Sequence, residues 1–164
     1  LIEEYQIIHP TGDAKEFSDY GRFLHLRKML PTSLQPRYVP VKFISPGDIQ
    51  KVFEDSDLVI SRAGINTVTQ LLLIDKPALL IPLITGQKQE QWNNAHMVKK
   101  TGLGEVYTQD ALTGSVLLRA VQTMLAKKKF YHNHDLSNMQ QLHTHAARNL
   151  VDIILKRIQR KTKH

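Results

Sequence analysis

Residues 58–83 read LVISRAGINTVTQLLLIDKPALLIPL, two apolar runs separated by a segment with helical spacing. The runs at 58–61 and 78–83 predict β-strands, and 67–74 predicts a helix that Asp75-Lys76-Pro77 ends. The second run is continuously apolar, which is typical of a strand buried on both faces. A helix between two strands provides the crossover that parallel pairing requires, so we predict that these strands are parallel.

The same alternation continues on both sides of this stretch. Further strands are predicted at 5–9, 38–44 and 105–107, and further helices at 17–30, from Ser45-Pro46 to about 53, at 89–101 and at 113–127. Pro40 predicts a bulge or an edge position in its strand. Gly102 is expected to end the helix before it. This order predicts an α/β fold, with a Rossmann-like parallel sheet and helices on both faces.

Length and composition limit the class of protein. The chain has 164 residues, of which 41% are hydrophobic and 23% charged, so it suits a single folded domain and not a disordered chain. The absence of cysteine excludes a disulfide scaffold, a thiolate zinc site and a cysteine nucleophile. The longest apolar run, 77–84, is too short to cross a bilayer. The first residues lack an initiator Met, and we expect a fragment of a longer protein.

The net charge of +7 lies in the C-terminal tail, because residues 127–164 hold 9 basic and 2 acidic residues. A helix is predicted over 135–164, with Ser137 and Gln140 as a capping box and 127–134 as a linker before it. Either this tail is a solvated helix, or it contacts an anionic membrane surface. Nucleic acid is not expected, because no recognition helix or aromatic-studded basic stripe is present.

Ligands of open parallel sheets bind at the carboxyl ends of the strands. The segments that follow the predicted strands are polar or contain glycine: 9–12, 43–46, 61–67 and 83–94. Gly64 is expected to allow a turn that a side chain would block. Asn66 and Thr67 then open a helix, whose N-terminus favours an anion such as phosphate; any loop between a strand and a helix has similar features.

Two amides mark the last of these segments. Gln91 and Asn94 are three residues apart and share one face of a helix near its start, which suits a ligand rich in hydroxyl groups. The alternative is a solvated first turn with Trp92 packed inward. The sequence contains no phosphate-binding lysine loop, no HExxH and no serine nucleophile elbow, so no catalytic residue is predicted.

Four motifs in this order resemble the C-terminal halves of the MurG family of UDP-N-acetylglucosamine transferases, in glycosyltransferase family 28. They are His9-Pro10-Thr11-Gly12, Phe43-Ile44, the segment 61–67 (Ser-Arg-Ala-Gly-Ile-Asn-Thr), and Gln91-Trp92-Asn93-Asn94-Ala95. Each motif alone is weak, and their order and separation carry the resemblance. It implies one half of a GT-B fold, with the first strand, a Gly-rich loop and the N-terminal acceptor domain absent from the chain.

The resemblance also implies roles for individual residues. Thr11 would lie near the nucleotide, and the Ile44 backbone would bond the uracil edge. The turn of Gly64, Ile65, Asn66 and Thr67 would hold the diphosphate, and Gln70 would meet the ribose. Gln91 and Asn94 would hold the N-acetylglucosamine hydroxyls, with Glu90 beside them. The family has Glu where this chain has Gln70, and His or Gln where it has Glu90.

The implied reaction is inverting transfer of N-acetylglucosamine from UDP to a polyprenyl-linked muramoyl-pentapeptide, in peptidoglycan synthesis at the inner face of the cell membrane. No cofactor or metal is implied, and this chain, which holds the leaving-group side, is expected to be inactive alone. Two alternatives remain open. One is the catalytic subunit of a split UDP-sugar transferase acting on another polyprenyl-linked acceptor, and the other is a non-catalytic nucleotide- or partner-binding module.

Overall fold

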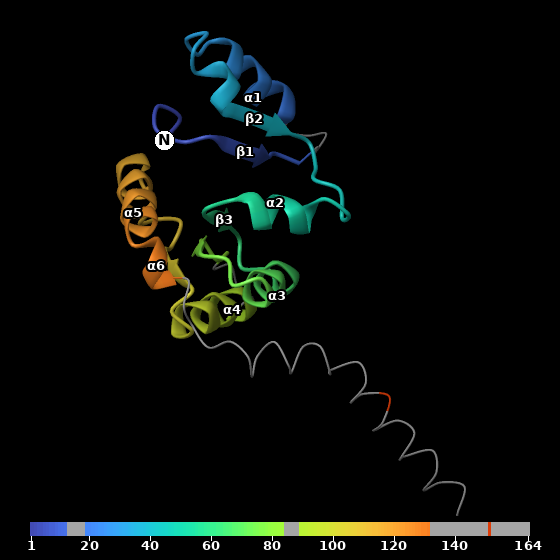
Figure 1. The fold of residues 1–164 in the computed structure, drawn as a ribbon, viewed down its shortest axis with the longest axis vertical. Helices are drawn as coiled ribbons and strands as arrows, with labels where there is room; N and C mark the ends of the chain where they lie inside the picture. Colours follow the sequence, from blue (N-terminus) through green and yellow to red (C-terminus); the bar gives the residue numbers. More distant parts are fainter. Residues whose placement is uncertain (13–18, 84–88, 132–150, 152–164) are drawn as a thin grey trace, which may run out of the picture. The chain divides into compact units, whose positions relative to one another are not determined.

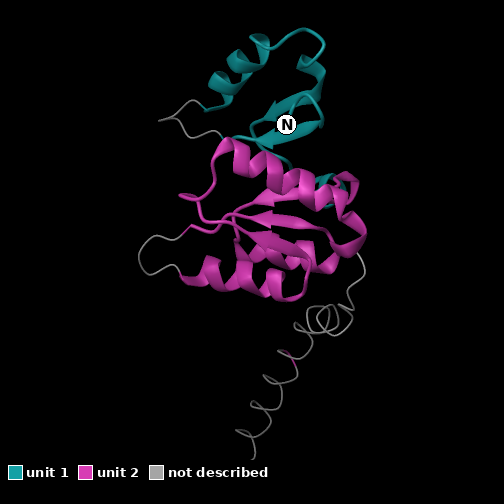
Figure 2. Cartoon of the chain, turned by 90° about the vertical axis from the view of Figure 1, so that its left-hand side faces the viewer, with its two compact units in different colours: residues 1–52 teal, residues 53–164 magenta. Residues whose placement is uncertain are grey.

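The computed structural model describes residues 1–12, 19–83, 89–131 and 151. The chain forms two compact units, residues 1–52 and residues 53–164, coloured separately in Figure 2. Each unit contains its own parallel sheet.

Unit 1 contains two parallel strands joined by a helix. Strand β1 (Ile7–Pro10) pairs with β2 (Tyr38–Val41), and α1 (Asp19–Lys28) lies between them in sequence (Figure 1). A short 3-10 helix, η1 (Gln35–Arg37), precedes β2 and was not predicted. The Arg27 Nε group donates to the Gln35 carbonyl at 2.9 Å, which ties η1 to the end of α1.

Helix α2 (Ile49–Asp55) begins later than the sequence predicted. Ser45 was expected to cap the helix with Pro46 in its first turn. Instead Ser45 caps a separate turn: its Oγ atom accepts from the Asp48 amide at 3.2 Å, and its carbonyl accepts from the Ile49 amide at 3.0 Å. Helical hydrogen bonding follows from Asp48, whose carbonyl accepts from the Val52 amide.

Unit 2 contains a three-stranded parallel sheet in the order β3-β4-β5. The strands are β3 (Val59–Ser61), β4 (Ala78–Leu80) and β5 (Gly104–Val106), and the helices between them are α3 (Ile65–Leu73) and α4 (Gln89–Lys100). Helices α3 and α4 contact each other, so they share one face of the sheet. Figure 2 shows helices above and below the strands of this unit, which confirms the predicted layers.

The core of unit 2 is built from the central strand and the inner faces of its helices. All three residues of β4 are fully buried, as its continuous apolar sequence predicted. Val68, Leu71 and Leu72 of α3 and Ala95 and Val98 of α4 pack against it. Burial of such side chains stabilises the folded state by ~1.5–3 kcal/mol each. Because β4 is held in this core, the positions at which the loops after the strands begin are fixed as well.

The end of unit 2 differs from the predicted linker at 127–134. Helix α5 (Gly114–Ala126) is capped by the Thr113 side chain, and a further turn, α6 (Lys128–Tyr131), follows within the expected linker. The physical reason is packing, because Tyr131 is buried and donates its hydroxyl to Glu105 Oε1 at 3.2 Å. The predicted capping box of Ser137 and Gln140, and all of the helix over 135–164 except Val151, lie outside the described residues. Among the helices that are described, none is long and apolar enough to span a membrane.

Candidate functional site

The carboxyl ends of β3, β4 and β5 lie at one edge of the sheet of unit 2, because the three strands are parallel neighbours. The ladder extends one residue beyond the strands here: the Ile81 amide donates to the Ser61 carbonyl at 2.9 Å, and the Tyr107 amide donates to the Leu80 carbonyl at 3.0 Å. The loop after β3 and the segments after β4 and β5 therefore start side by side.

Helix α3 presents its N-terminus at this edge without a side-chain cap. Its N-cap residue is Gly64, with extended backbone, and the first helical bond runs from the Val68 amide to the Gly64 carbonyl at 3.0 Å. The helix therefore starts at Ile65, two residues earlier than predicted. Its first amides, on Ile65, Asn66 and Thr67, have no partner within the helix, and such amides favour an anion.

The backbone conformation at Gly64 does not require a glycine. Its φ is −65°, which any residue adopts, and an added Cβ would meet no atom within 4 Å. The prediction that a side chain would block this turn is wrong, because the chain leaves open space at this position. Because glycine has no side chain, no side-chain atom of residue 64 lies beside the N-terminal amides of α3.

Gln91 and Asn94 both reach from α4 to neighbouring loop backbone. The Leu83 amide donates to Gln91 Oε1 at 3.0 Å, and Asn94 Nδ2 donates to the Ala63 carbonyl at 3.1 Å. In the alternative of a solvated first turn with Trp92 packed inward, the part that concerns Trp92 is wrong, whereas Gln89, Glu90 and Asn93 are exposed, as that alternative expected. Trp92 is 36% exposed, and its ring lies against the His96 ring in a tilted arrangement, with centroids 4.2 Å apart.

The other two predicted residues of unit 2 flank this group. Gln70 is half-buried on α3, and its carbonyl accepts from the Ile74 amide at the end of that helix. Glu90 is exposed in the first turn of α4. The structure thus places all eight predicted residues of unit 2 on α3, on α4 or on the residue that caps α3.

Thr11 and Ile44 belong to unit 1. The Thr11 amide donates to the Val41 carbonyl at 2.9 Å, and its hydroxyl donates to the same carbonyl at 3.2 Å. Gly12 follows with a φ of +76°, a left-handed conformation that favours glycine. Ile44 is half-buried three residues beyond β2. Both residues therefore follow the carboxyl ends of paired parallel strands, as the sequence predicted.

Sequence reasoning missed the roles of two residues near these groups. Arg62 donates from Nη1 to the Ile81 carbonyl at 3.1 Å and from Nη2 to Gln109 Oε1 at 2.8 Å. In the sequence, Arg62 stands out only as part of the motif at 61–67, and nothing marks Gln109. No local pattern marks a pair that is 47 residues apart in the chain.

His9, two residues before Thr11, joins β1 to β2 and to α1. Its Nδ1 lies 2.8 Å from the Tyr38 hydroxyl, and its ring meets Phe23 edge-on at 4.7 Å between centroids. Burial lowers the pKa of His9 from its usual 6.5, and the charge of Asp19 opposes that shift. A neutral imidazole between two aromatic side chains supports packing of α1 on the strands.

The fold and this edge define a Rossmann-like α/β chain with polar groups where such sheets bind ligands. Residues 1–152 match the family model described as the Glycosyltransferase family 28 C-terminal domain, and the chain belongs to that family.

Curated relatives share the name UDP-N-acetylglucosamine--N-acetylmuramyl-(pentapeptide) pyrophosphoryl-undecaprenol N-acetylglucosamine transferase. The one from Lachnospira eligens is 32% identical over 134 residues, covering 80% of this chain and 34% of the relative. The one from Thermodesulfovibrio yellowstonii is 28% identical, covering 98% of this chain and 41% of the relative. This chain therefore spans only about a third to two-fifths of the length of these relatives.

Solved structures agree on the fold. The crystal structure of Acinetobacter baumannii MurG superposes with a TM-score of 0.68 at 23% identity, covering 92% of this chain and 41% of that one. A glycosyltransferase of kitacinnamycin superposes with a TM-score of 0.53 at 20% identity. These likenesses confirm the predicted α/β architecture of one half of a GT-B glycosyltransferase.

Proposed function

We propose that this chain is the donor-binding half of an inverting N-acetylglucosaminyltransferase and that it binds UDP-N-acetylglucosamine. One observation carries the proposal: an uncapped helix N-terminus and the amide-bearing face of α4 start from the same carboxyl edge. The first suits a diphosphate and the second suits sugar hydroxyls. The family membership and the names of the curated relatives support the same ligand.

The proposed contacts follow the positions of the groups in each unit. The amides of Ile65, Asn66 and Thr67 hold the diphosphate, with the open space at Gly64 allowing close approach. Gln70 meets the ribose, and Gln91 and Asn94, with Glu90 beside them, meet the sugar. In unit 1, the Ile44 backbone reads the uracil edge and Thr11 lies near the nucleotide.

The proposed chemistry of this half is stabilisation of the leaving group. As the bond from the anomeric carbon to the diphosphate breaks, negative charge grows on the diphosphate, and the helix N-terminus is already oriented toward it. Activation of the acceptor, a polyprenyl-linked muramoyl-pentapeptide, is assigned to the rest of the protein. The chain alone is therefore expected to bind donor and to transfer nothing.

Calorimetry with UDP and UDP-N-acetylglucosamine tests this proposal. We expect saturable binding at sub-millimolar to millimolar ligand, weakened in Asn94→Ala and unchanged in Asn93→Ala, which truncates the adjacent exposed amide. No heat at millimolar ligand with a folded sample would contradict the donor site. Equal losses in the two variants would contradict the assignment of Asn94.

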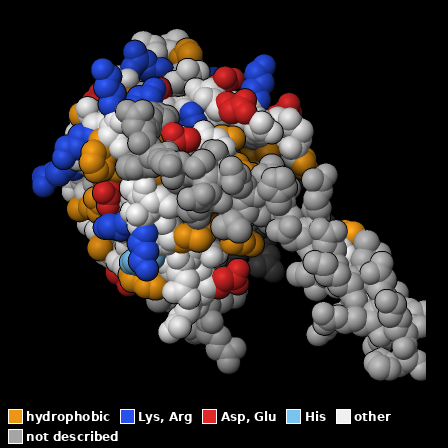
Figure 3. All heavy atoms as spheres, turned by 60° about the horizontal axis from the view of Figure 1, so that its bottom comes forward, with side chains coloured by type: hydrophobic (Ala, Val, Ile, Leu, Met, Phe, Trp, Pro, Cys, Tyr) orange, Lys and Arg blue, Asp and Glu red, His pale blue; other side chains and the backbone are white. Residues whose placement is uncertain are grey.

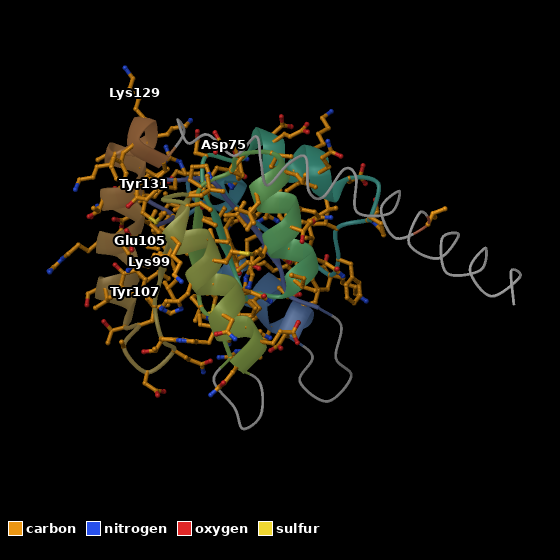
Figure 4. The ribbon with its side chains drawn as sticks, turned by 90° about the horizontal axis from the view of Figure 1, so that it is seen from below. Asp75, Lys99, Glu105, Tyr107, Lys129 and Tyr131 are labelled. Atoms are coloured by element: carbon orange, nitrogen blue, oxygen red, sulfur yellow. The ribbon has the colours of Figure 1, made fainter. Side chains whose placement is uncertain are left out.

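We also propose peripheral contact with an anionic membrane surface through the C-terminal basic segment. In α6, Lys128 pairs with Asp57 and Tyr131 packs inward, while Phe130 remains 64% exposed. Figure 4 shows Lys129 pointing away from the body of the protein, whereas Tyr131 lies beside Glu105. An exposed aromatic side chain beside a lysine suits an anionic lipid surface, where each basic residue contributes ~1 kcal/mol. Lys and Arg side chains on one face of the chain are blue in Figure 3.

Flotation with vesicles of phosphatidylglycerol and phosphatidylcholine tests the membrane proposal. Binding is expected to fall after removal of residues 156–164 and in Phe130→Ser, and to remain in Phe43→Ser, which removes an equally exposed aromatic from unit 1. Binding that is independent of phosphatidylglycerol would contradict a contact driven by charge.

One observation favours the non-catalytic alternative, namely the Gln70 and Glu90 departures from the family pattern. A transfer assay on an intact parent protein, with a polyprenyl-linked muramoyl-pentapeptide as acceptor, separates the two functions. Donor binding without transfer would favour the binding module.

A further inference from the structure

Three hydrogen bonds join the edge of unit 2 into a closed ring. Arg62, after β3, donates to the Ile81 carbonyl after β4. Leu83, in the same segment after β4, donates its amide to Gln91 of α4. Asn94 of α4 donates back to the Ala63 carbonyl, next to Arg62. The ring runs from the loop after β3 to the segment after β4, then to α4, and back to the loop after β3.

Arg62 is the member of the ring that also reaches the segment after β5. Its second donor, Nη2, bonds Gln109 Oε1 at 2.8 Å, so one planar guanidinium spans all three strand ends. A lysine ammonium lacks this fixed fork and holds two separated acceptors less well. Ala63, beside Arg62, is fully buried, which fixes the backbone from which the Arg62 side chain extends.

The ring orients the two amides of α4. It uses the acceptor oxygen of Gln91 and a donor nitrogen of Asn94. The end of each amide outside the ring is then Nε2 of Gln91, a donor, and Oδ1 of Asn94, an acceptor. A sugar bearing adjacent hydroxyl groups both donates and accepts, so this pairing matches it. This complementarity to the sugar depends on the three hydrogen bonds. If either amide were flipped, it would present an acceptor in place of the donor, or a donor in place of the acceptor.

We propose that Arg62, held by Gln109, is a positioning residue for the sugar subsite of the donor. This inference rests on the proposed function and adds that Arg62 acts through the segment after β4 and α4, not through the phosphate. Arg62 and Gln109 are both exposed, and exposed hydrogen bonds stabilise a fold only slightly. Their effect is therefore expected on sugar recognition and not on folding.

The test compares UDP with UDP-N-acetylglucosamine by calorimetry on the full chain. In Arg62→Gln, we expect the ratio Kd(UDP)/Kd(UDP-N-acetylglucosamine) to fall about fivefold, roughly the effect of one neutral hydrogen bond. The Kd for UDP and the melting temperature are expected to stay near those of the parent. Gln109→Ala should shift the ratio in the same direction, and Arg119→Gln, an exposed arginine of α5, should leave it unchanged.

Arg62→Lys separates positioning from charge. If position matters, the lysine variant behaves like Arg62→Gln, whereas a parent-like ratio would show that charge suffices and would overturn the proposal. Equal weakening of both ligands would indicate direct phosphate contact or general damage, and would also overturn it. If the parent chain binds UDP and UDP-N-acetylglucosamine with the same Kd, it has no sugar subsite for Arg62 to position. That result would overturn this inference but not the binding of UDP. A parent chain that binds neither ligand removes the proposed function as well.

Amide hydrogen exchange supplies a readout without ligand. The Leu83 amide is expected to exchange faster in Arg62→Gln than in the parent, because the segment after β4 loses the hydrogen bond from Arg62 to the Ile81 carbonyl. The Val68 amide, inside α3, serves as the internal control and should not change. Unchanged protection at Leu83 would show that Arg62 does not hold this segment.

Discussion

Gly104, the first residue of β5, pairs with Ala78 of β4 in the parallel ladder. A Cβ at this position would overlap the Ala78 carbonyl oxygen and lie 3.1 Å from Val98 Cγ1. Both neighbours are fully buried, so neither has room to move. Glycine is thus required here by packing and not by backbone conformation.

Gly104→Ala is therefore expected to destabilise unit 2 by about 1–3 kcal/mol, the usual cost of overpacking a core. Gly114→Ala is the matched control, because a Cβ there meets nothing within 4 Å at the start of α5. The control is expected to be neutral or stabilising by ~0.4–1 kcal/mol. Urea unfolding measures both variants, and equal stabilities would contradict the close contact at Gly104.

Gly64→Ala is expected to fold like the parent, since a Cβ there meets open space. The same methyl group would stand beside the α3 N-terminus, where the diphosphate is proposed to bind. UDP affinity should fall at least tenfold while the urea midpoint stays within error. Parent-like UDP binding in a folded Gly64→Ala sample would argue against the diphosphate position.

Gln70→Glu restores the carboxylate found in the family. A hydrogen bond to a charged acceptor exceeds a neutral one by about 1 kcal/mol, so UDP should bind roughly fivefold more tightly. The gain is expected to vanish with 2′,3′-dideoxy-UDP, which lacks the ribose hydroxyls. A gain of equal size with both nucleotides would contradict a ribose contact.

At the scale of elements, α6 is held to the sheet by a buried phenol. Tyr131 bonds Glu105, whose other carboxylate oxygen lies 3.2 Å from Lys99 Nζ (Figure 4). Burial, followed by the charge of Glu105, raises the pKa of Tyr131 to about 12, against 10.0 for a free tyrosine. Ionisation of the phenol would remove the hydrogen-bond donor to Glu105 and place two negative charges side by side, so it weakens the packing of α6.

This pKa shift predicts a loss of stability in alkali. Between pH 10 and about pH 12 the unfolded chain has lost the phenolic proton while the folded protein keeps it, so the free energy of unfolding falls as pH rises. Tyr131→Phe should be about 1 kcal/mol less stable at pH 8 and show a weaker decline between pH 10 and 12. Tyr20→Phe, in unit 1, is the control. An identical alkaline decline in Tyr131→Phe and the parent would rule out this source.

At the scale of the whole molecule, donor binding and catalysis are expected to separate. A ligand that binds only the folded state stabilises it by ~2.7 kcal/mol at a hundred times its Kd. Saturating UDP should therefore raise the melting temperature of the chain by several degrees. The same sample should release no UDP from UDP-N-acetylglucosamine in the presence of acceptor, and measurable transfer by this chain alone would contradict the assignment of acceptor activation elsewhere.

Much of the architecture was predictable because it depends on local patterns. The apolar run at 78–83 predicted a buried central strand, and Gly102 and Asp75 mark helix ends at the expected places, with φ values of 78° and 51°. The 3-10 helix η1 and the turn α6 were not predicted. Both depend on contacts with distant residues, such as Tyr131 with Glu105, which no local pattern announces.

The site residues were chosen from their positions after strands and from the family resemblance, and their ligand contacts remain predictions. The spacing of Gln91 and Asn94 correctly indicated a shared helix face. It could not indicate that each amide already bonds a loop backbone, because the partners Leu83 and Ala63 meet α4 only once the sheet has formed. The expectation that a side chain at position 64 would block the turn was wrong for a similar reason, since open space is a property of the assembled neighbours.

The amino-acid sequence by itself determined the alternation of strands and helices, the burial of β4 and the family to which the chain belongs. These features follow from periodicity, turn residues and short motifs, all of which act over a few residues. Only the tertiary structure decided which polar groups hold one another at the edge of the sheet. The physical reason is that parallel pairing places the ends of β3, β4 and β5 side by side. Arg62 and Gln109, 47 residues apart in the chain, can form their hydrogen bond only after this pairing.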